Sequence, residues 1–272
     1  MRRGVIQVMR SLRTDRVVVK VGTNTLASEG RGLNYVLIES IAEQISKLKE
    51  QGHEFIVVTS GAIGLGCSEL SLPKRPSEIV LRQVCAAIGQ SKVMEVYHRA
   101  FEHYGGIVAQ ILLTYGDFKD ESKHKNLRNG IRELLRLGVT PIINENDVVA
   151  TDEIAGAFGD NDSLSAMVSV DVGAGLLIIL TDVDGLYDGD PRNNDGARLI
   201  GTVTEITPEI EAMAGRTGSG LAVGGMKTKI DAARVCMGAG CDLVIANGRE
   251  DDVIRRIVEG EELGTLFRGR SD

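Results

Sequence analysis

The sequence is poor in aromatic residues and has no tryptophan. Aromatic side chains make up only 4% of the 272 residues, so the core has to be built from valine, isoleucine, leucine and alanine. Proline is also scarce, with 5 residues against 33 glycines, while the hydrophobic share of 43% is ordinary for a globular chain. Few prolines and many glycines indicate tight turns and close backbone contacts rather than disorder.

Further absences exclude whole classes of protein. No apolar run reaches the about 18 residues of a membrane span, and a net charge of −7 argues against a nucleic-acid partner. The histidines lack the spacing of metal ligands or of a triad, and HExxH, GxSxG, HRD and DFG motifs are missing. A nucleophile activated by histidine or cysteine is therefore not expected. The cysteines form no CxxC pair and are expected to be buried free thiols in a reducing cytoplasm: Cys67, Cys85, Cys236 and Cys241.

Runs of apolar, β-branched residues alternate with amphipathic helical patterns along the chain. Such alternation predicts an α/β fold, in which helices cover both faces of a mostly parallel sheet. The expected strands are Arg16–Val21, His53–Thr59, Ile107–Leu113, Val139–Asn144, Leu176–Thr181, Asp242–Ala246 and Thr265–Phe267. The expected helices are Asn34–Gln51, Ser77–Tyr104, Asp117–Leu137, Asn161–Val170 and Gly225–Gly238.

Three local expectations accompany this fold. Asn34 is placed to cap its helix, whose buried face is predicted to carry Val36, Leu37, Ile41, Ile45 and Leu48. The irregular stretches 146–159 and 185–204 suggest hairpins or lids. Residues 1–16 hold five arginines and lack the apolar stretch of a signal peptide, so we expect a solvated extension there.

Four of the expected strands end in polar, glycine-containing clusters. These are Lys20–Thr23, Thr59–Ala62, Asn144–Asp147 and Thr181–Gly185. Ligands of open α/β sheets bind at the carboxyl ends of the strands. One such cluster is ordinary loop chemistry, but four successive ones predict a shared site.

Lys20 interrupts a buried apolar strand, where a lysine is seldom tolerated without a partner. One interpretation is an edge strand, or a side chain that reaches out to water. The other is a fixed positive charge aimed at a phosphate, with Gly22 allowing a ligand close to the backbone.

Three glycine-containing segments could bind ligands, and each also has a plainer interpretation. Ser60–Gly66 leads from a strand into a helix whose free amides favour anions, although a tight turn explains it equally and no GxGxxG spacing fits. Gly159–Asp162 opens a helix, and its plainer interpretation is an N-cap. Its polar groups could instead order lysines, hold Mg²⁺ through water or bind an amino group. Gly218–Lys229 combines glycines with Lys227 and Lys229, which suits a polyphosphate, but it breaks the GxxxxGK[ST] spacing and could be a flexible loop before a solvated helix.

This set of residues suits phosphoryl transfer, in which positioning and charge neutralisation dominate. A carboxylate acceptor is already ionised at neutral pH and needs no general base. A site of lysine, aspartate, asparagine, glycine and Mg²⁺ would therefore suffice.

Six short motifs occur over residues 17–268 in the order that one known family shows: Val17–Thr23, Val57–Ile63, Pro141–Asp147, Gly159–Asp162, Leu180–Asp182 with Gly185–Tyr187, and Gly224–Lys229. With these motifs the chain resembles the amino acid kinase family, and the second and third look specifically like its glutamate 5-kinase branch. The resemblance implies an αβα sandwich with a substrate lobe at 17–172 and a nucleotide lobe at 173–272. It also implies transfer of phosphate from ATP to the side-chain carboxylate of L-glutamate, the first step of proline biosynthesis.

The same resemblance implies roles for individual residues. Lys20 and Lys229 would contact the ATP phosphates and stabilise the transferring phosphoryl group, with Asp162 orienting both lysines. Mg²⁺ would bridge the β- and γ-phosphates, and no side chain is assigned as its ligand. Glutamate would be bound by Ser60, Asp147 and Asn161. The ATP site would comprise Lys20, Thr181, Asp182, Val223, Gly224, Gly225, Met226, Lys227, Thr228 and Lys229.

Members of the family are often inhibited by proline and form homo-oligomers, here expected to be a dimer or tetramer. Many bacterial members carry a C-terminal PUA domain, which we expect this form to lack because the sequence stops at Asp272. Val223 stands where threonine is common, and residues before Arg16 have no counterpart in the family pattern.

Three rival hypotheses remain at this stage. A sister kinase would act on aspartate, N-acetylglutamate, carbamate, UMP or isopentenyl phosphate. A nucleotide sensor without catalysis would keep the fold, but the joint presence of Lys20, Asp162 and Lys229 argues against it. A dinucleotide oxidoreductase is disfavoured by the missing GxGxxG spacing.

Overall fold

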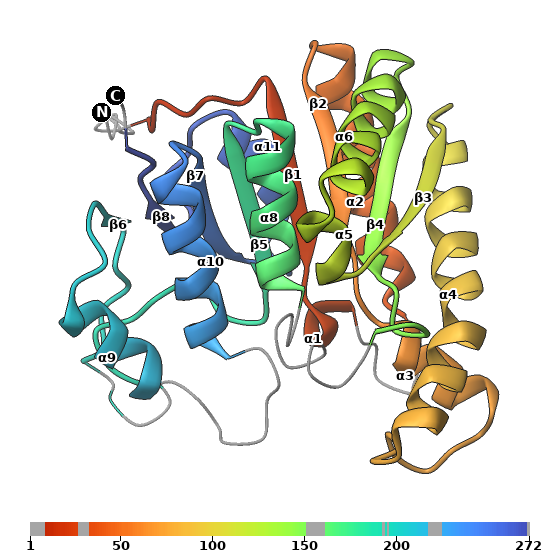
Figure 1. The fold of residues 1–272 in the computed structure, drawn as a ribbon. Helices are drawn as coiled ribbons and strands as arrows, with labels where there is room; N and C mark the ends of the chain where they lie inside the picture. The colour runs from red at the N-terminus through yellow and green to blue at the C-terminus, as the bar shows by residue number, and fades with distance from the viewer. Residues whose placement is uncertain are drawn as a thin grey trace.

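The computed structural model describes residues 9–26, 33–150, 161–191, 194, 196–216 and 225–270. Its centre is an eight-stranded sheet with the order β3-β4-β2-β1-β5-β7-β8-β6 (Figure 1). Among the described strands only β7 and β8 pair antiparallel, so the predicted mostly parallel sheet is confirmed. The strands are β1 Arg16–Val21, β2 Glu54–Val58, β3 Val108–Leu113, β4 Thr140–Glu145, β5 Leu176–Thr181, β6 Thr202–Val203, β7 Asp242–Asn247 and β8 Thr265–Phe267.

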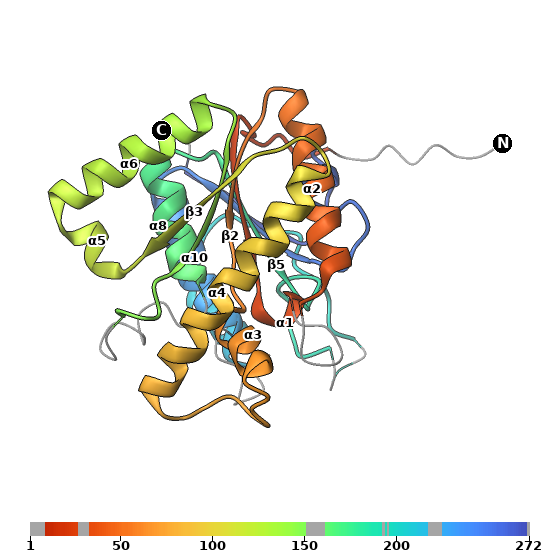
Figure 2. The ribbon, with the colours of Figure 1, turned by 90° about the vertical axis from the view of Figure 1, so that its right-hand side faces the viewer.

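Helices cover both faces of this sheet, as the side view in Figure 2 shows. One layer contains α2, α4 and α11, and the other contains α6, α8 and α10. Each layer has its own hydrophobic core, and β1 serves both because Val17 and Val19 face one layer while Val18 faces the other. The helices are α1 Thr23–Leu26, α2 Tyr35–Glu50, α3 Ala62–Glu69, α4 Ile79–Glu102, α5 Tyr115–Lys119, α6 Glu121–Arg136, α8 Asp162–Val172, α9 Pro208–Arg216, α10 Met226–Gly238 and α11 Val253–Val258.

Helix α2 begins where the sequence predicts. The Asn34 side chain accepts a hydrogen bond from the Leu37 amide at 3.1 Å, which confirms the N-cap. The predicted buried face is wrong at Val36, which is 79% exposed. Ile38 takes its place, because the stripe that packs on the sheet follows the i, i+3, i+7 spacing from this residue.

Helix prediction fails where short elements meet. The single helix expected over 117–137 is two helices, α5 and α6, separated at Asp120. Asp120 is extended and its side chain caps the Lys123 amide at 3.0 Å, so it starts a new helix instead of continuing the old one. The elements α1, α9, α11 and β6 are absent from the prediction, since they are too short for a clear period.

The segment 9–15, here called the N-terminal strap, is anchored to the protein at Arg10, where the predicted solvated extension is wrong. Its exposed residues agree with that prediction, and residues 1–8 lie outside the described residues. The strap passes along the edge of the sheet before entering β1 (Figure 1). Arg10 is 9% exposed, and its backbone amide donates to the Gly260 carbonyl at 2.6 Å. Its guanidinium donates to the carbonyls of Leu263 at 2.6 Å and Gly201 at 2.8 Å. Arginine suits this position because its guanidinium carries several N–H donors and the carbonyls of several loop ends converge on it.

The four cysteines are free and buried, as predicted. The Sγ atoms of Cys67 and Cys85 lie 3.6 Å apart, at the crossing of α3 and α4. Within the described ranges no helix is long and apolar enough to cross a membrane.

Candidate active site

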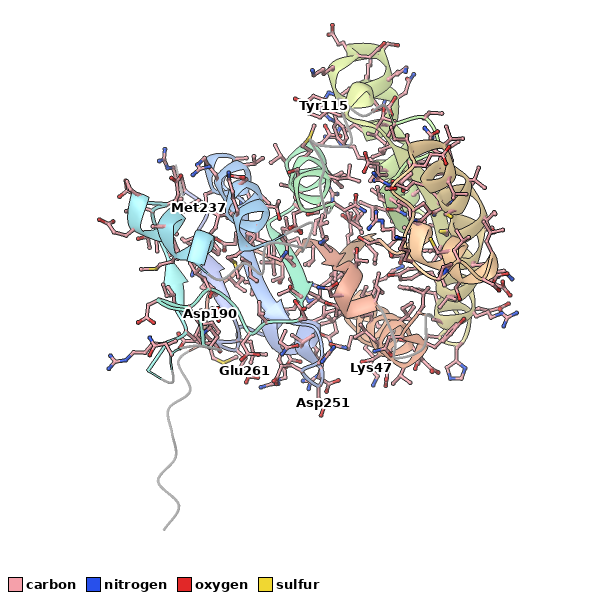
Figure 3. The ribbon with its side chains drawn as sticks, turned by 90° about the horizontal axis from the view of Figure 1, so that it is seen from below. Lys47, Tyr115, Asp190, Met237, Asp251 and Glu261 are labelled. Atoms are coloured by element: carbon pink, nitrogen blue, oxygen red, sulfur yellow. The ribbon has the colours of Figure 1, made fainter. Side chains whose placement is uncertain are left out.

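The four polar strand ends come together in space. Strands β4, β2, β1 and β5 are neighbours in the sheet and all run parallel. Their carboxyl ends therefore lie along one edge, which Figure 3 views from below. Tyr115 and Lys47 are labelled on opposite sides of the sheet in that view, and they mark the two helical layers. The four polar clusters therefore converge as expected, and a shared ligand site at this edge stays a prediction.

Lys20 points into the protein and meets Asp162. Its Nζ lies 2.7 Å from Asp162 Oδ1, and both side chains have 0% exposure. The other oxygen, Oδ2, binds Lys229 Nζ at 3.1 Å and accepts from the Thr228 hydroxyl at 2.7 Å. Strand β1 lies between β2 and β5, so the alternative of an edge or water-reaching lysine is excluded.

The carboxyl group of Asp162 is held in its charged form by the two lysines. Burial acts to raise the pKa of Asp162, but the charges of Lys20 and Lys229 and the hydrogen bonds to the carboxylate outweigh it, so the pKa is lowered. One carboxylate between two lysines leaves a surplus of positive charge in a water-poor region. Such a surplus attracts an anion with several oxygens.

Asn161 connects this trio to the neighbouring strands. Its backbone is left-handed, with φ 55° and ψ 4°, which is uncommon for a residue other than glycine. The side chain does not cap its helix but donates to the Thr59 carbonyl at 2.7 Å and to Asn144 Oδ1 at 2.8 Å. It also lies 3.3 Å from the Ser60 hydroxyl. The predicted pair Ser60 and Asn161 is thus brought together, and the N-cap alternative for Asn161 is wrong.

The acidic side of the site lies at the end of β4. Burial raises the pKa of Asp147, although Arg75 and Arg82 oppose the rise. Glu145 is affected more strongly: burial, together with the charge of Asp147, raises its pKa to about 7 despite Arg82. Two carboxyl groups and two arginines therefore share this part of the edge.

The opposite side of the site lies at the end of β5. The Thr181 hydroxyl donates to Asp182 Oδ1 at 3.2 Å, and Asn24 on α1 donates to Oδ2 of the same carboxylate at 3.2 Å. Gly22 packs against this strand, because a Cβ there would lie 3.1 Å from the Leu180 carbonyl. A side chain at this position would press on β5, so the glycine also favours strand packing. The predicted approach of a ligand to Gly22 stays a prediction.

The start of α10 supplies the rest of the predicted phosphate loop. Gly225 precedes the helix, Met226 is buried, and Lys227 is exposed. The Thr228 hydroxyl, which has one proton to donate, lies 2.8 Å from the Gly225 carbonyl oxygen and 2.7 Å from Asp162 Oδ2. Of the other predicted residues in this loop, 223 and 224 lie outside the described residues.

Residues 15–247 match the model of the amino acid kinase family. The chain belongs to this family. A glutamate 5-kinase from Methanococcoides burtonii is 51% identical over 253 residues, which cover 93% of this chain and 68% of that relative. A glutamate 5-kinase from Clostridium perfringens is 45% identical over 254 residues, covering 93% of this chain and 94% of the relative.

Two solved kinase structures share the fold at low sequence identity. An isopentenyl phosphate kinase superposes with a TM-score of 0.64 at 18% identity, over 93% of this chain and 99% of that one. UMP kinase from Ureaplasma parvum superposes with a TM-score of 0.60 at 16% identity, over 94% of this chain and 100% of that one. The predicted αβα amino acid kinase fold is confirmed.

Three residues near the strand ends were not among the predicted site residues. Asn144 was seen only as part of a strand end, yet its side chain joins Asn161 to Gln90. Gln90 and Arg82 lie within α4, where nothing in the helical pattern distinguishes them. A polar residue on the sheet-facing side of a helix was the one available signal.

Proposed function

We propose that the chain is a glutamate 5-kinase, which transfers the terminal phosphoryl group of ATP to the side-chain carboxylate of L-glutamate. The products are ADP and L-glutamyl 5-phosphate, and the reaction is the first step of proline biosynthesis. The carrying observation is the buried Lys20–Asp162–Lys229 trio beside the row formed by Ser60, Asn161 and Asn144. The glutamate 5-kinases at 45 to 51% identity support the choice of acceptor.

The two lysines are the charged groups that act on the phosphates. Negative charge shifts from the transferring group to the leaving oxygen during phosphoryl transfer, and fixed cations stabilise that change. Asp162 holds Lys20 and Lys229 from opposite oxygens and so sets the spacing between them. We assign Asp162 an orienting role, because both of its oxygens are occupied by cations and by Thr228.

The acceptor needs no general base. A glutamate side-chain carboxylate is ionised at neutral pH, so one of its oxygens can attack the γ-phosphorus directly. The bond from phosphorus to the β,γ-bridging oxygen breaks, and the electron pair leaves with ADP. Ser60, Asp147 and Asn161 bind the glutamate in this proposal.

In this proposal Mg²⁺ would enter the site together with the nucleotide. Within the described residues, no group of three His, Cys, Asp or Glu side chains is arranged to hold a metal ion. The ion would neutralise charge on the β- and γ-phosphates. The protein contributes the lysines and the amides at the start of α10.

The proposal assigns these groups to two lobes. Residues 17–172 form the proposed substrate lobe and 173–272 the proposed nucleotide lobe. In the second lobe Thr181 and Asp182 line the nucleotide site, and residues 223–229 surround the phosphates. Lys20 crosses from the first lobe to reach the same phosphates.

A hydroxylamine trap tests the proposed reaction. The protein is incubated with Mg²⁺, ATP and one acceptor at a time, and acyl phosphate is measured as hydroxamate while ADP release is followed in parallel. The acceptors are glutamate, aspartate, N-acetylglutamate, carbamate, UMP and isopentenyl phosphate. Hydroxamate with glutamate alone is expected. ADP release with another acceptor, and no signal with glutamate, would overturn the assignment.

Regulation, assembly and location belong to the same proposal. We propose feedback inhibition by proline, a homo-oligomer (dimer or tetramer) and a cytoplasmic location. Light scattering coupled to size-exclusion chromatography measures the oligomer, and a proline titration of the hydroxamate assay measures the inhibition.

A further inference from the structure

Three polar atoms near the end of β4 are out of contact with water and lack partners. They are Nε of Arg82 and Nε2 of Gln90, both on α4, and Oε1 of Glu145. None of the three has a hydrogen-bond partner in the described part of the chain. Leaving a buried donor or acceptor unsatisfied is costly, so a group of them indicates that a ligand completes their bonding. We call these residues the acceptor-end cluster.

The acceptor-end cluster continues the row of residues already placed in the site. Gln90 Oε1 accepts a hydrogen bond from Asn144 at 2.8 Å, and Asn144 in turn accepts one from Asn161 at 2.8 Å. Asn161 lies next to Asp162 in the chain, so the row leads from the two lysines to the cluster. A ligand that extends along this row reaches the phosphates at one end and the cluster at the other.

The charges around the cluster are mixed. The charges of Arg75 and Arg82 both act to lower the pKa of Asp147. At Glu145, the charge of Asp147 acts to raise the pKa and that of Arg82 to lower it. Two cations and two carboxyl groups thus face a small region. That combination is complementary to a zwitterion, which brings one ammonium and one carboxylate group.

We propose that Arg82 and Glu145 bind the α-carboxylate and the α-ammonium group of the acceptor, respectively, with Gln90 donating a second hydrogen bond to the carboxylate. The inference rests on the proposed glutamate kinase activity and adds the residues that select an amino acid at the end remote from the chemistry. It makes Arg82 and Glu145 specificity-determining residues. An acid that lacks one of the two α-groups would lose one of these contacts.

The first test removes the cation and compares two acceptors. In Arg82→Met, the KM for glutamate is expected to rise about 10- to 100-fold, the range for a lost charged hydrogen bond. The kcat should stay within about twofold, because the phosphates are untouched. The inhibition constant of 4-aminobutyrate, which lacks the α-carboxylate, should not change. Arg82→Lys should recover part of the loss, since it restores the charge without the planar fork.

The second test removes the carboxyl group. Glu145→Gln should raise the KM for glutamate and leave the inhibition constant of glutarate unchanged, because glutarate lacks the α-ammonium group. Arg99→Met is the matched control, since Arg99 also lies on α4 but is 76% exposed and pairs with Glu95. Thermal unfolding of each variant shows that the fold is retained.

The possible results distinguish a failure of the proposed subsite from a failure of the proposed reaction. An unchanged KM for glutamate in Arg82→Met, or equal losses with glutamate and 4-aminobutyrate, would overturn the subsite alone. Wild-type binding of glutarate as tight as that of glutamate would overturn the role of Glu145. If the wild type makes no hydroxamate from glutamate, the proposed function fails and the subsite fails with it.

Discussion

At the scale of single residues, the site depends on charges that are stable only together. Lys20 and Asp162 are both fully buried, and an isolated charge in that position would be strongly unfavourable. The 2.7 Å contact offsets much of that cost, and Lys229 with Thr228 satisfies the second oxygen of Asp162. Loss of Asp162 leaves two buried lysines, whereas loss of Lys20 leaves Asp162 still paired. The trio is therefore asymmetric in its response to mutation.

Lys20→Met tests this asymmetry. We expect kcat to fall by about 10²- to 10³-fold, as when a fixed group that stabilises transition-state charge is removed. The free energy of unfolding should change by less than about 2 kcal/mol, because methionine fills the space and Asp162 keeps Lys229. Hydroxamate rates and urea unfolding measure the two quantities. Lys47→Met is the control, as Lys47 is 58% exposed. Equal losses of activity and stability would make Lys20 a structural residue.

Glu145 gives a prediction about pH. Its pKa in the folded protein is about 7, above the about 4.3 of an unfolded chain. The folded state binds the proton more tightly, so this carboxyl group lowers stability as pH rises from about 4.5 to 7. Asp147 and Arg82 are the charged groups that act on it.

Replacing Glu145 with glutamine removes that penalty. We expect Glu145→Gln to be more stable than the wild type at pH 8 by about 1 kcal/mol, a value reduced for solvent screening of a half-buried group, with little difference at pH 4.5. Urea unfolding at the two pH values measures the effect. A difference that is the same at both pH values would show that Glu145 keeps an ordinary pKa.

At the scale of elements, the crossing of α3 and α4 determines where Ser60 and Gly61 lie. The two helices touch through glycines: a Cβ on Gly89 would be 1.8 Å from the Ala62 carbonyl oxygen, and one on Gly66 would be 1.8 Å from that of Cys85. Helix α3 starts directly after Ser60 and Gly61, so its angle against α4 sets the position of the Ser60 hydroxyl. Packing of backbone against backbone thus controls a site residue.

Gly89→Ala should disturb both packing and binding. The added methyl group meets backbone and not a movable side chain, so we expect a loss of about 1–3 kcal/mol in unfolding free energy and a raised KM for the acceptor. Gly130→Ala on α6 is the matched control, because nothing lies within 4 Å of its Cβ position. The control should gain about 0.5–1 kcal/mol from helix propensity. Equal effects of the two substitutions would contradict the crossing model.

At the scale of the whole molecule, the N-terminal strap connects parts that are distant in sequence. Arg10 bonds to carbonyls at Gly201, Gly260, Leu263 and Gly264, which belong to the loops around α11, β6 and β8. Arg268 donates to the Ser11 carbonyl at 2.7 Å. The strap therefore ties the β8–β6 end of the sheet to β1 at its centre.

Arg10→Ala tests this connection. Three carbonyls would lose a charged donor in a region with little water, and we expect the free energy of unfolding to fall by about 2–4 kcal/mol. The kcat should be nearly unchanged, since the strap lies away from the carboxyl ends of the strands. Arg136→Ala, at a side chain 66% exposed, should change stability by less than about 0.5 kcal/mol. A similarly small effect at Arg10 would mean that the strap rests on the surface without stabilising it.

Prediction from the sequence succeeded where local pattern was sufficient. The bounds of β1, β5 and β8 agree with the structure, because consecutive apolar residues between turn signals indicate a buried strand. The Asn34 cap was predicted correctly because it is also a local feature: the amide that it binds belongs to Leu37, three residues later. The prediction failed at Asp120, where one capping side chain outweighs helical periodicity.

The sequence by itself determined a parallel α/β sheet and the polar clusters at its strand ends, and the family resemblance supplied the roles of Lys20, Asp162 and Lys229. Only the tertiary structure decided that β4, β2, β1 and β5 are neighbours, because strand order depends on packing between distant segments. It also decided that Arg10 is buried and that Arg82 and Gln90 meet the end of β4. A local pattern records which face of an element is buried. It does not record which distant partner covers that face.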